Sequence, residues 1–244
     1  MAREELNTET RLVKLPPTPR QRYTAFALAV LLLAGFLVSA PLAHRALPRI
    51  DAFLPTVASA ISVTDFITSV LLFAHFSIYR SRALLALASG YLYTSLVVIP
   101  NALTFPGAFS PTGLLGASPQ TAGWLYFFWH TGFAAALLIY ASQKSRKAAR
   151  DDVRSSPLFA IGWSVAIVVV VVCAITLLAT AAASVLPPLF IDETLFAPAA
   201  DHLFLFMLLV CGFAFFAMWS RRRSVLDYWL TIVALALICE VALS

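Results

Sequence analysis

The sequence predicts an all-helical (all-α), polytopic transmembrane helix bundle, and three observations lead to this fold class. Apolar side chains make up 61% of the 244 residues and charged side chains only 12%, where a soluble domain carries about 25% charged residues. The mean hydropathy is +0.87, an apolar excess too large for the core of one soluble domain. The apolar residues also fall in seven long runs with few charges, which is typical of membrane-spanning helices. These observations exclude a disordered chain and argue against a water-soluble globule.

Each run is long enough to cross a bilayer, which takes about 20 mostly apolar residues. The expected spans are Tyr23–Leu42, Thr56–Tyr79, Ala83–Leu103, Thr121–Ala141, Leu158–Leu186, His202–Trp219 and Val225–Ser244. We interpret the first span as a membrane helix and not as a signal peptide, because 22 polar and proline-containing residues precede it. The chain therefore divides into a basic segment, residues 1–22, and a membrane domain, residues 23–244.

The basic residues predict a cytoplasmic N-terminus. With this orientation, 15 of the 17 Lys and Arg residues lie in cytoplasmic segments, as the positive-inside rule requires. Only Arg45 and Arg49 fall outside, where the loop before the sixth span carries acidic residues. Seven spans place Ser244 outside with no polar anchoring residues after it, so we expect an eighth span beyond this residue, returning the chain to the cytoplasm.

Several functional classes find no support in the sequence. The basic residues lie in short clusters between apolar runs, which argues against a nucleic-acid partner. Cys173, Cys211 and Cys239 lie singly inside apolar runs, so we expect small core residues and not a metal site or a disulfide. The sequence contains no glycine-rich phosphate loop, His-Glu-x-x-His helix or Gly-x-Ser-x-Gly elbow. We therefore expect no catalytic residues in this chain, and membrane lipid as its surroundings.

Residues 83–143 contain no Asp, Glu, Lys or Arg, although they include two expected spans and the loop that joins them. The loop, residues 105–119, is rich in proline and glycine, which favour fixed turns. Irregular backbone at membrane depth is tolerated where protein covers it or where it lines a cavity. We expect this loop to act as an outer lid or re-entrant segment, and the alternative is a structured apolar loop in the headgroup zone.

Three titratable residues fall in the central to outer layer of the expected bundle. Asp65 and Glu240 lie about 22 and 25 Å from the cytoplasmic arginines of their spans, and His130 lies about 20 Å deep. An unpaired carboxylate there costs about 2.5 to 3.5 kcal/mol on insertion scales, so both acids are expected to face inward, take up a proton or pair. The functional interpretation is a polar site for a ligand, protons or a small cation, with Asn101 in its wall. The structural alternative is an interhelical pair that only fixes packing.

Aromatic residues are a second group of candidates for this site. Tyr91, Trp124, Tyr126 and Trp129 could line a pocket for a planar or apolar ligand, although such residues more often pack a bundle or face lipid. A bis-histidine haem is disfavoured, because His75 lies about 8 Å below His130 along the membrane normal. Ala86, Gly90 and Thr94 recur every four residues, a spacing of small side chains that predicts close helix packing.

Two segments carry a resemblance to a known family. They are residues 90–116, which begin GYLYTSLVVIPNALTFPGAF and end GLLG, and residues 124–133, WLYFFWHTGF. The combination of Thr-Phe-Pro-Gly at 104–107 with Trp-His-Thr-Gly-Phe at 129–133 is its most specific part. Together they resemble the fourth type of bacterial membrane-associated sensor domain, from about Asp65 to Ser244. The family pattern has His where this chain has Asn101. A ligand-binding role that needs this histidine is therefore not carried over from the family to this chain.

The resemblance implies a function. Proteins of this kind place a multi-pass sensor in the bacterial inner membrane, ahead of a cytoplasmic GGDEF diguanylate cyclase or a histidine kinase. We therefore expect a signal-input domain, with the stimulus read under the loop near Asp65, Asn101, His130 and Glu240 and the output passed on by helix packing, with a homodimer as one route. The stimulus and any cofactor are undefined. The alternatives are a small transporter, for which we find no internal repeat, and a haem- or quinone-binding membrane protein.

Overall fold

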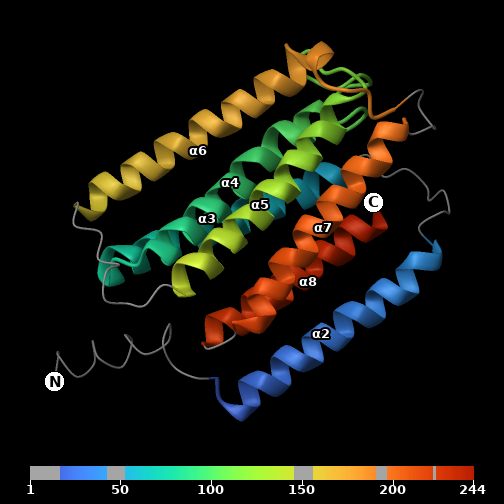
Figure 1. The fold of residues 1–244 in the computed structure, drawn as a ribbon. Coiled ribbons are helices and arrows are strands. Elements are labelled where there is room, and N and C mark those ends of the chain that lie inside the picture. The colour runs from blue at the N-terminus through green and yellow to red at the C-terminus, as the bar shows by residue number, and fades with distance from the viewer. Residues whose placement is uncertain (1–16, 43–52, 146–155, 191–196, 222–223) are drawn as a thin grey trace. The chain divides into compact units, whose positions relative to one another are not determined.

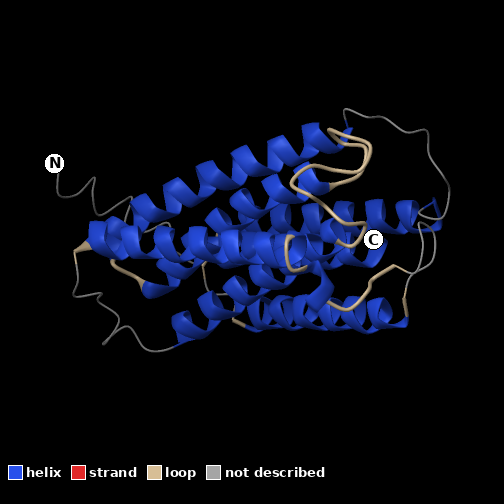
Figure 2. Ribbon diagram, turned by 90° about the horizontal axis from the view of Figure 1, so that it is seen from above, coloured by secondary structure: helices blue, strands red, loops and turns tan. Residues whose placement is uncertain are grey.

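The computed structural model describes residues 17–42, 53–145, 156–190, 197–221 and 224–244. This part of the chain contains seven helices long and apolar enough to cross a membrane, and no strand (Figures 1 and 2). They are α2 Pro19–Ser39, α3 Phe53–Tyr79, α4 Arg82–Thr104, α5 Thr121–Ser145, α6 Pro157–Thr180, α7 Pro198–Ser220 and α8 Val225–Leu243. The prediction of an all-helical, seven-span chain is confirmed, and its orientation in the membrane stays a prediction.

Four predicted span ends differ from the helix ends by four residues or more, namely Tyr23, Ala141, Leu186 and His202. The fifth span was expected to reach Leu186, but α6 ends at Thr180 and a 3-10 turn, Ala183–Val185, follows. Leu186 has extended backbone, with φ −86° and ψ 141°, because the ring of Pro187 disfavours a helical conformation in the residue before it. The sixth helix begins at Pro198 and not at His202, since proline is well tolerated in the first turn of a helix.

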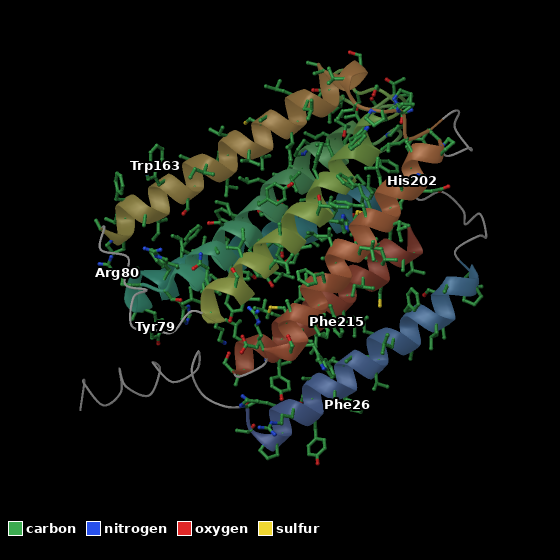
Figure 3. The ribbon with its side chains drawn as sticks, viewed as in Figure 1. Phe26, Tyr79, Arg80, Trp163, His202 and Phe215 are labelled. Atoms are coloured by element: carbon green, nitrogen blue, oxygen red, sulfur yellow. The ribbon has the colours of Figure 1, made fainter. Side chains whose placement is uncertain are left out.

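The chain forms two compact units. The central unit, residues 48–207, holds α3 to α6 and the first part of α7, and the terminal unit is made of residues 1–47 and 208–244. Within the terminal unit α2 packs against α8. Most apolar side chains of α2 are exposed, as on Phe26 (Figure 3), which suits a helix that faces lipid.

Within the central unit, α4 is the central helix. It packs against α3, α5 and α6, and 67% of its apolar stretch is buried, against 11% of that of α3. The three helices α3, α4 and α5 run side by side (Figure 1). Trp163 of α6 is exposed and points away from them (Figure 3). α4 therefore carries the contacts that hold this unit together.

Small side chains let α4 approach its neighbours, as their spacing predicted. A Cβ atom added to Gly90 would lie 2.5 Å from the Cβ of Ala136 on α5. Only glycine fits at this contact, because side chains pack without overlap in protein interiors. Thr94, from the same predicted series, instead contacts α3 through its hydroxyl group.

Candidate functional site

The interface between α3 and α4 is lined by polar groups. Ser62, Asp65 and Ser69 lie three and four residues apart on α3, and this spacing places them on one helical face. They meet Ala88, Thr94 and Ser95 of α4, and we call these six residues together the α3–α4 seam. Helices in lipid gain no hydrophobic stabilisation from association, so interhelical hydrogen bonds and close packing hold such a seam.

Two serine contacts flank the centre of the seam. Ser62 Oγ donates to the Ser95 carbonyl oxygen at 3.0 Å, and Ser95 Oγ donates to the Ser62 carbonyl oxygen at 2.9 Å. On the other side, Ser69 Oγ donates to the Ala88 carbonyl oxygen at 2.9 Å. These bonds set the register of the two helices and so determine what lies opposite Asp65.

Asp65 lies between the serine contacts, halfway along α3. It is 12 residues from Phe53 and 14 from Tyr79, which is about 18 and 21 Å along the helix. Its side chain is half-buried, and its Oδ2 lies 2.6 Å from Thr94 Oγ1. Among the hydrogen bonds and ion pairs of the described residues, this is the contact that Asp65 makes. The carboxyl group therefore sits at mid-membrane depth against a neutral hydroxyl group.

Tyr91 is one turn away from Thr94 on α4. Its carbonyl oxygen is 2.9 Å from Thr94 Oγ1, and its ring packs edge-on against Phe133 of α5, with the ring centroids 5.2 Å apart. Of the predicted aromatic candidates, Tyr91 is the one that the described contacts bring to Asp65.

His130 makes its contacts on α5. Its side chain is fully buried, and its Nδ1 lies 2.9 Å from the Tyr126 carbonyl oxygen, so this nitrogen carries the hydrogen. Its ring packs at a tilt against those of Tyr126 and Trp129, with centroid distances of 3.9 and 4.8 Å. The structure thus joins three predicted site residues in one aromatic cluster, and it gives Asp65 the Thr94 hydroxyl as its partner.

The other predicted site residues are Asn101, Trp124 and Glu240, and the described hydrogen bonds join none of them to Asp65. Asn101 is buried, and its amide Nδ2 donates to the Ala122 carbonyl oxygen at 3.0 Å. Trp124 is also buried and donates from Nε1 to the Pro187 carbonyl oxygen at 3.2 Å. Both side chains tie segments of the bundle together. Glu240 belongs to α8 in the terminal unit, where its side chain is exposed.

Sequence analysis missed Gln120, which makes three hydrogen bonds at the start of α5. Its Oε1 accepts from the Leu189 and Phe190 N–H groups at 2.6 and 2.9 Å, and its Nε2 donates to the Phe190 carbonyl oxygen at 2.9 Å. The Ala197 N–H group in turn donates to the Leu189 carbonyl oxygen at 2.8 Å. An amide side chain inside an uncharged stretch was the available signal, because such a group needs partners when it leaves water.

The 105–119 loop is built from tight turns on the end of α4. The Leu114 N–H group donates to the Leu103 carbonyl oxygen at 2.8 Å. Gly113 has φ +81°, and a Cβ atom there would lie 2.3 Å from the Thr104 carbonyl oxygen. Four large apolar side chains of this loop are exposed, namely Phe105, Phe109, Leu114 and Leu115. The loop lies at the end of the central unit opposite the α3–α4 turn at Arg80 (Figures 1 and 3).

The arrangement can perform only limited chemistry. In the part of the chain that the structure describes, no three His, Cys, Asp or Glu side chains come together as a metal site. Asp65 and Thr94 can exchange a proton or bind a polar group. The aromatic cluster around His130 can make packing contacts with neighbouring apolar groups. Seven apolar helices with a polar seam between two of them are the architecture of a multi-pass membrane protein.

The family model for a membrane-associated sensor, integral membrane domain (MASE4), matches residues 48–244. The chain belongs to this family, and its role is that of a membrane sensor domain. The match begins after α2, so the first span lies outside it. Comparison with curated proteins and with solved structures gave no significant match.

Proposed function

We propose that this chain is the signal-input domain of a larger regulatory protein and reads its stimulus at the α3–α4 seam. In this proposal the N-terminus is cytoplasmic, the membrane is the bacterial inner membrane, and the output controls a GGDEF diguanylate cyclase or a histidine kinase. The family membership supports a sensory role. The resemblance of residues 90–133 supports the two classes of effector.

The observation that carries the proposal is the contact between Asp65 and Thr94 across two helices at mid-membrane depth. A carboxylate near the bilayer centre costs about 2.5 to 3.5 kcal/mol on insertion scales. A purely structural polar contact does not need this cost, since the Ser62–Ser95 pair on one side and the Ser69–Ala88 bond on the other already join the helices. An ionisable group retained at such a place is a functional candidate by default.

The seam is also weak enough to respond to a stimulus. Interhelical hydrogen bonds in membrane proteins contribute about 0.6 kcal/mol each on average. A change of charge or hydrogen bonding at Asp65 is therefore comparable with the energy of the hydrogen bonds that join α3 to α4 at the seam. A stimulus that favours one arrangement of the two helices shifts their populations by its difference in affinity.

Substitution of Asp65 tests this function. In the full-length protein in its native membrane, Asp65→Ala is expected to change effector output by about fivefold or more, the lower end of typical coupling between sites. Output is measured as cyclic di-GMP formation for a cyclase or autophosphorylation for a kinase. Thr64→Ala is the matched control, because Thr64 is exposed on the same helix and bonds to its own backbone. Wild-type output from Asp65→Ala at equal protein level would contradict the proposal.

We further propose that the 105–119 loop lies in the headgroup zone and is not a lid. Its four exposed apolar side chains need an apolar surface, and its bonds to the end of α4 hold it at the edge of the bilayer. Tryptophan introduced by Phe109→Trp is expected to be quenched by lipids brominated on the acyl chains, beyond the quenching seen in the wild-type protein. If the brominated lipids do not quench the fluorescence of the introduced tryptophan, the side chain at position 109 lies away from the membrane.

A further inference from the structure

The Thr94 hydroxyl group lies within hydrogen-bond distance of two oxygens. Its Oγ1 is 2.6 Å from Asp65 Oδ2 and 2.9 Å from the Tyr91 carbonyl oxygen. A hydroxyl group carries one hydrogen, and an ionised carboxylate and a carbonyl group both only accept. When Asp65 is ionised, the two oxygens therefore compete for the single hydrogen of Thr94.

A proton on Asp65 removes this competition. The carboxylic acid then donates from Oδ2 to Thr94 Oγ1, and Thr94 donates its own hydrogen to the Tyr91 carbonyl oxygen. Each short contact holds one hydrogen, in a continuous chain from α3 to the backbone of α4. Hydrogen bonds arranged in such a chain polarise and strengthen one another in a medium of low dielectric constant.

We infer that Asp65 is a proton-binding site: it carries a proton in the resting domain, and loss of this proton is the event that the α3–α4 seam reads. The second part rests on the proposed sensory function of the seam and names its ligand. Loss of the proton turns the Thr94 hydroxyl toward the carboxylate and leaves a charge between the two serine contacts. Water or a cation entering to solvate this charge separates α3 from α4.

Among the described residues of α3, α4 and α6, no Lys or Arg lies close to Asp65 along its helix or the helices packed against it. Among the described helices of the central unit, α4 and α6 pack against α3. On α4 the titratable or charged residues are Tyr91, Tyr93 and Arg82, and Arg82 is 12 residues from Thr94, which is about 18 Å along the helix. Tyr93 donates its hydroxyl hydrogen to the Phe128 carbonyl oxygen. Of these residues, only Tyr91 is near the carboxyl group, and its hydroxyl is neutral at physiological pH.

The other two helices add no cation. α6 carries no Asp, Glu, Lys, Arg or His between Pro157 and Thr180, and its cysteine, Cys173, is exposed. On α3 itself, His75 is ten residues from Asp65, about 15 Å along the helix, and its Nδ1 binds the Leu71 carbonyl oxygen. Within its own unit, the half-buried carboxyl group therefore has neutral side chains around it, and burial away from water among neutral groups favours the protonated form.

Infrared spectroscopy of the full-length protein in phospholipid vesicles tests the proton directly, without using effector output. At neutral pH the wild-type protein is expected to show a carbonyl-stretching band of a protonated carboxylic acid that is lost in Asp65→Asn. Glu240→Gln is the matched control, since it also replaces an acid in a helix by its amide, and it is expected to leave this band in place. Thr94→Val should move the band without removing it, because the acid loses its hydrogen-bond acceptor.

Three results would overturn the inference. The first is a wild-type spectrum at neutral pH that matches the spectrum of Asp65→Asn in the carboxylic-acid region. The second is a band that Thr94→Val leaves unmoved. The third concerns sensing: effector output is expected to follow the loss of the band as the medium is made alkaline, and to become independent of pH in Asp65→Asn. If effector output does not change when the band is lost, the proton is not the stimulus.

These readouts separate the inference from the proposed function. If Asp65→Ala changes effector output but no acid band exists, the seam is sensory and its ligand is not a proton. If the band exists but Asp65→Ala leaves output unchanged, Asp65 binds a proton and the seam does not signal.

Discussion

Replacing Gln120 with leucine is expected to lower the free energy of unfolding by about 3 kcal/mol, because three hydrogen bonds to backbone are lost at about 1 kcal/mol each. Leucine has a similar size, so the loss comes from hydrogen bonding and not from packing. The Leu189 and Phe190 N–H groups lose their acceptor, and buried donors without a partner add to the cost. The measurement is unfolding of the detergent-purified protein by heat or by SDS.

The control for this substitution is Gln143→Leu, which changes the same residue type near the other end of α5. Gln143 lies near the end of the helix and is half-buried, and we expect a change within about 0.5 kcal/mol, as for ordinary surface substitutions. If the two variants lower the free energy of unfolding equally, the hydrogen bonds of Gln120 to residues 189 and 190 do not stabilise the domain. Signalling by Gln120→Leu is expected to fall with the amount of folded protein.

Replacing Gly113 with alanine should destabilise the domain by more than about 2 kcal/mol, for two reasons that add. A side chain at a positive φ costs about 1 to 2 kcal/mol. The new Cβ atom would also lie 2.3 Å from the Thr104 carbonyl oxygen, a backbone atom that cannot turn aside. The loop must therefore shift on the end of α4, and thermal unfolding in detergent measures the cost.

Two further glycines separate the contributions of strain and overlap. Gly116 also has a positive φ, +65°, but a Cβ atom there meets nothing within 4 Å, so Gly116→Ala should show only the strain of about 1 to 2 kcal/mol. Gly162 lies inside α6 with open space around it, and Gly162→Ala should be neutral or stabilising by up to about 1 kcal/mol. A Gly113→Ala variant no less stable than Gly116→Ala would show that the loop does not press on Thr104.

The sequence located the spans, and it did not reveal which side chains contact one another at the candidate site. Span positions follow from the length of the apolar runs, and the largest error, at Leu186, arose because apolar residues continue beyond the end of α6 at Thr180. Asp65 could be chosen from the sequence, because its cost in hydrocarbon can be estimated without knowing its neighbours. Its partner Thr94 was assigned to helix packing. A small side chain that recurs every four residues is compatible with helix packing and with hydrogen bonding equally well.

Other predicted site residues were chosen by type and depth alone. Asn101 and Trp124 sit at suitable depth, yet their polar atoms bind backbone carbonyl groups of other segments. His130 was placed beside the acids by depth, but its Nδ1 binds within its own helix. Depth along a helix is readable from residue number, whereas the direction in which a side chain points around the bundle is not.

Chain composition and run length were enough to establish a helical membrane protein with seven spans, because each helix in lipid must satisfy its own backbone hydrogen bonds and can be recognised one at a time. The pairing of α3 with α4, the contact of Asp65 with Thr94 and the attachment of residues 189–190 to Gln120 were decided only by the fold. Each of these depends on the rotation and register of two segments, and apolar runs that are uniform around the helix carry almost no information about either.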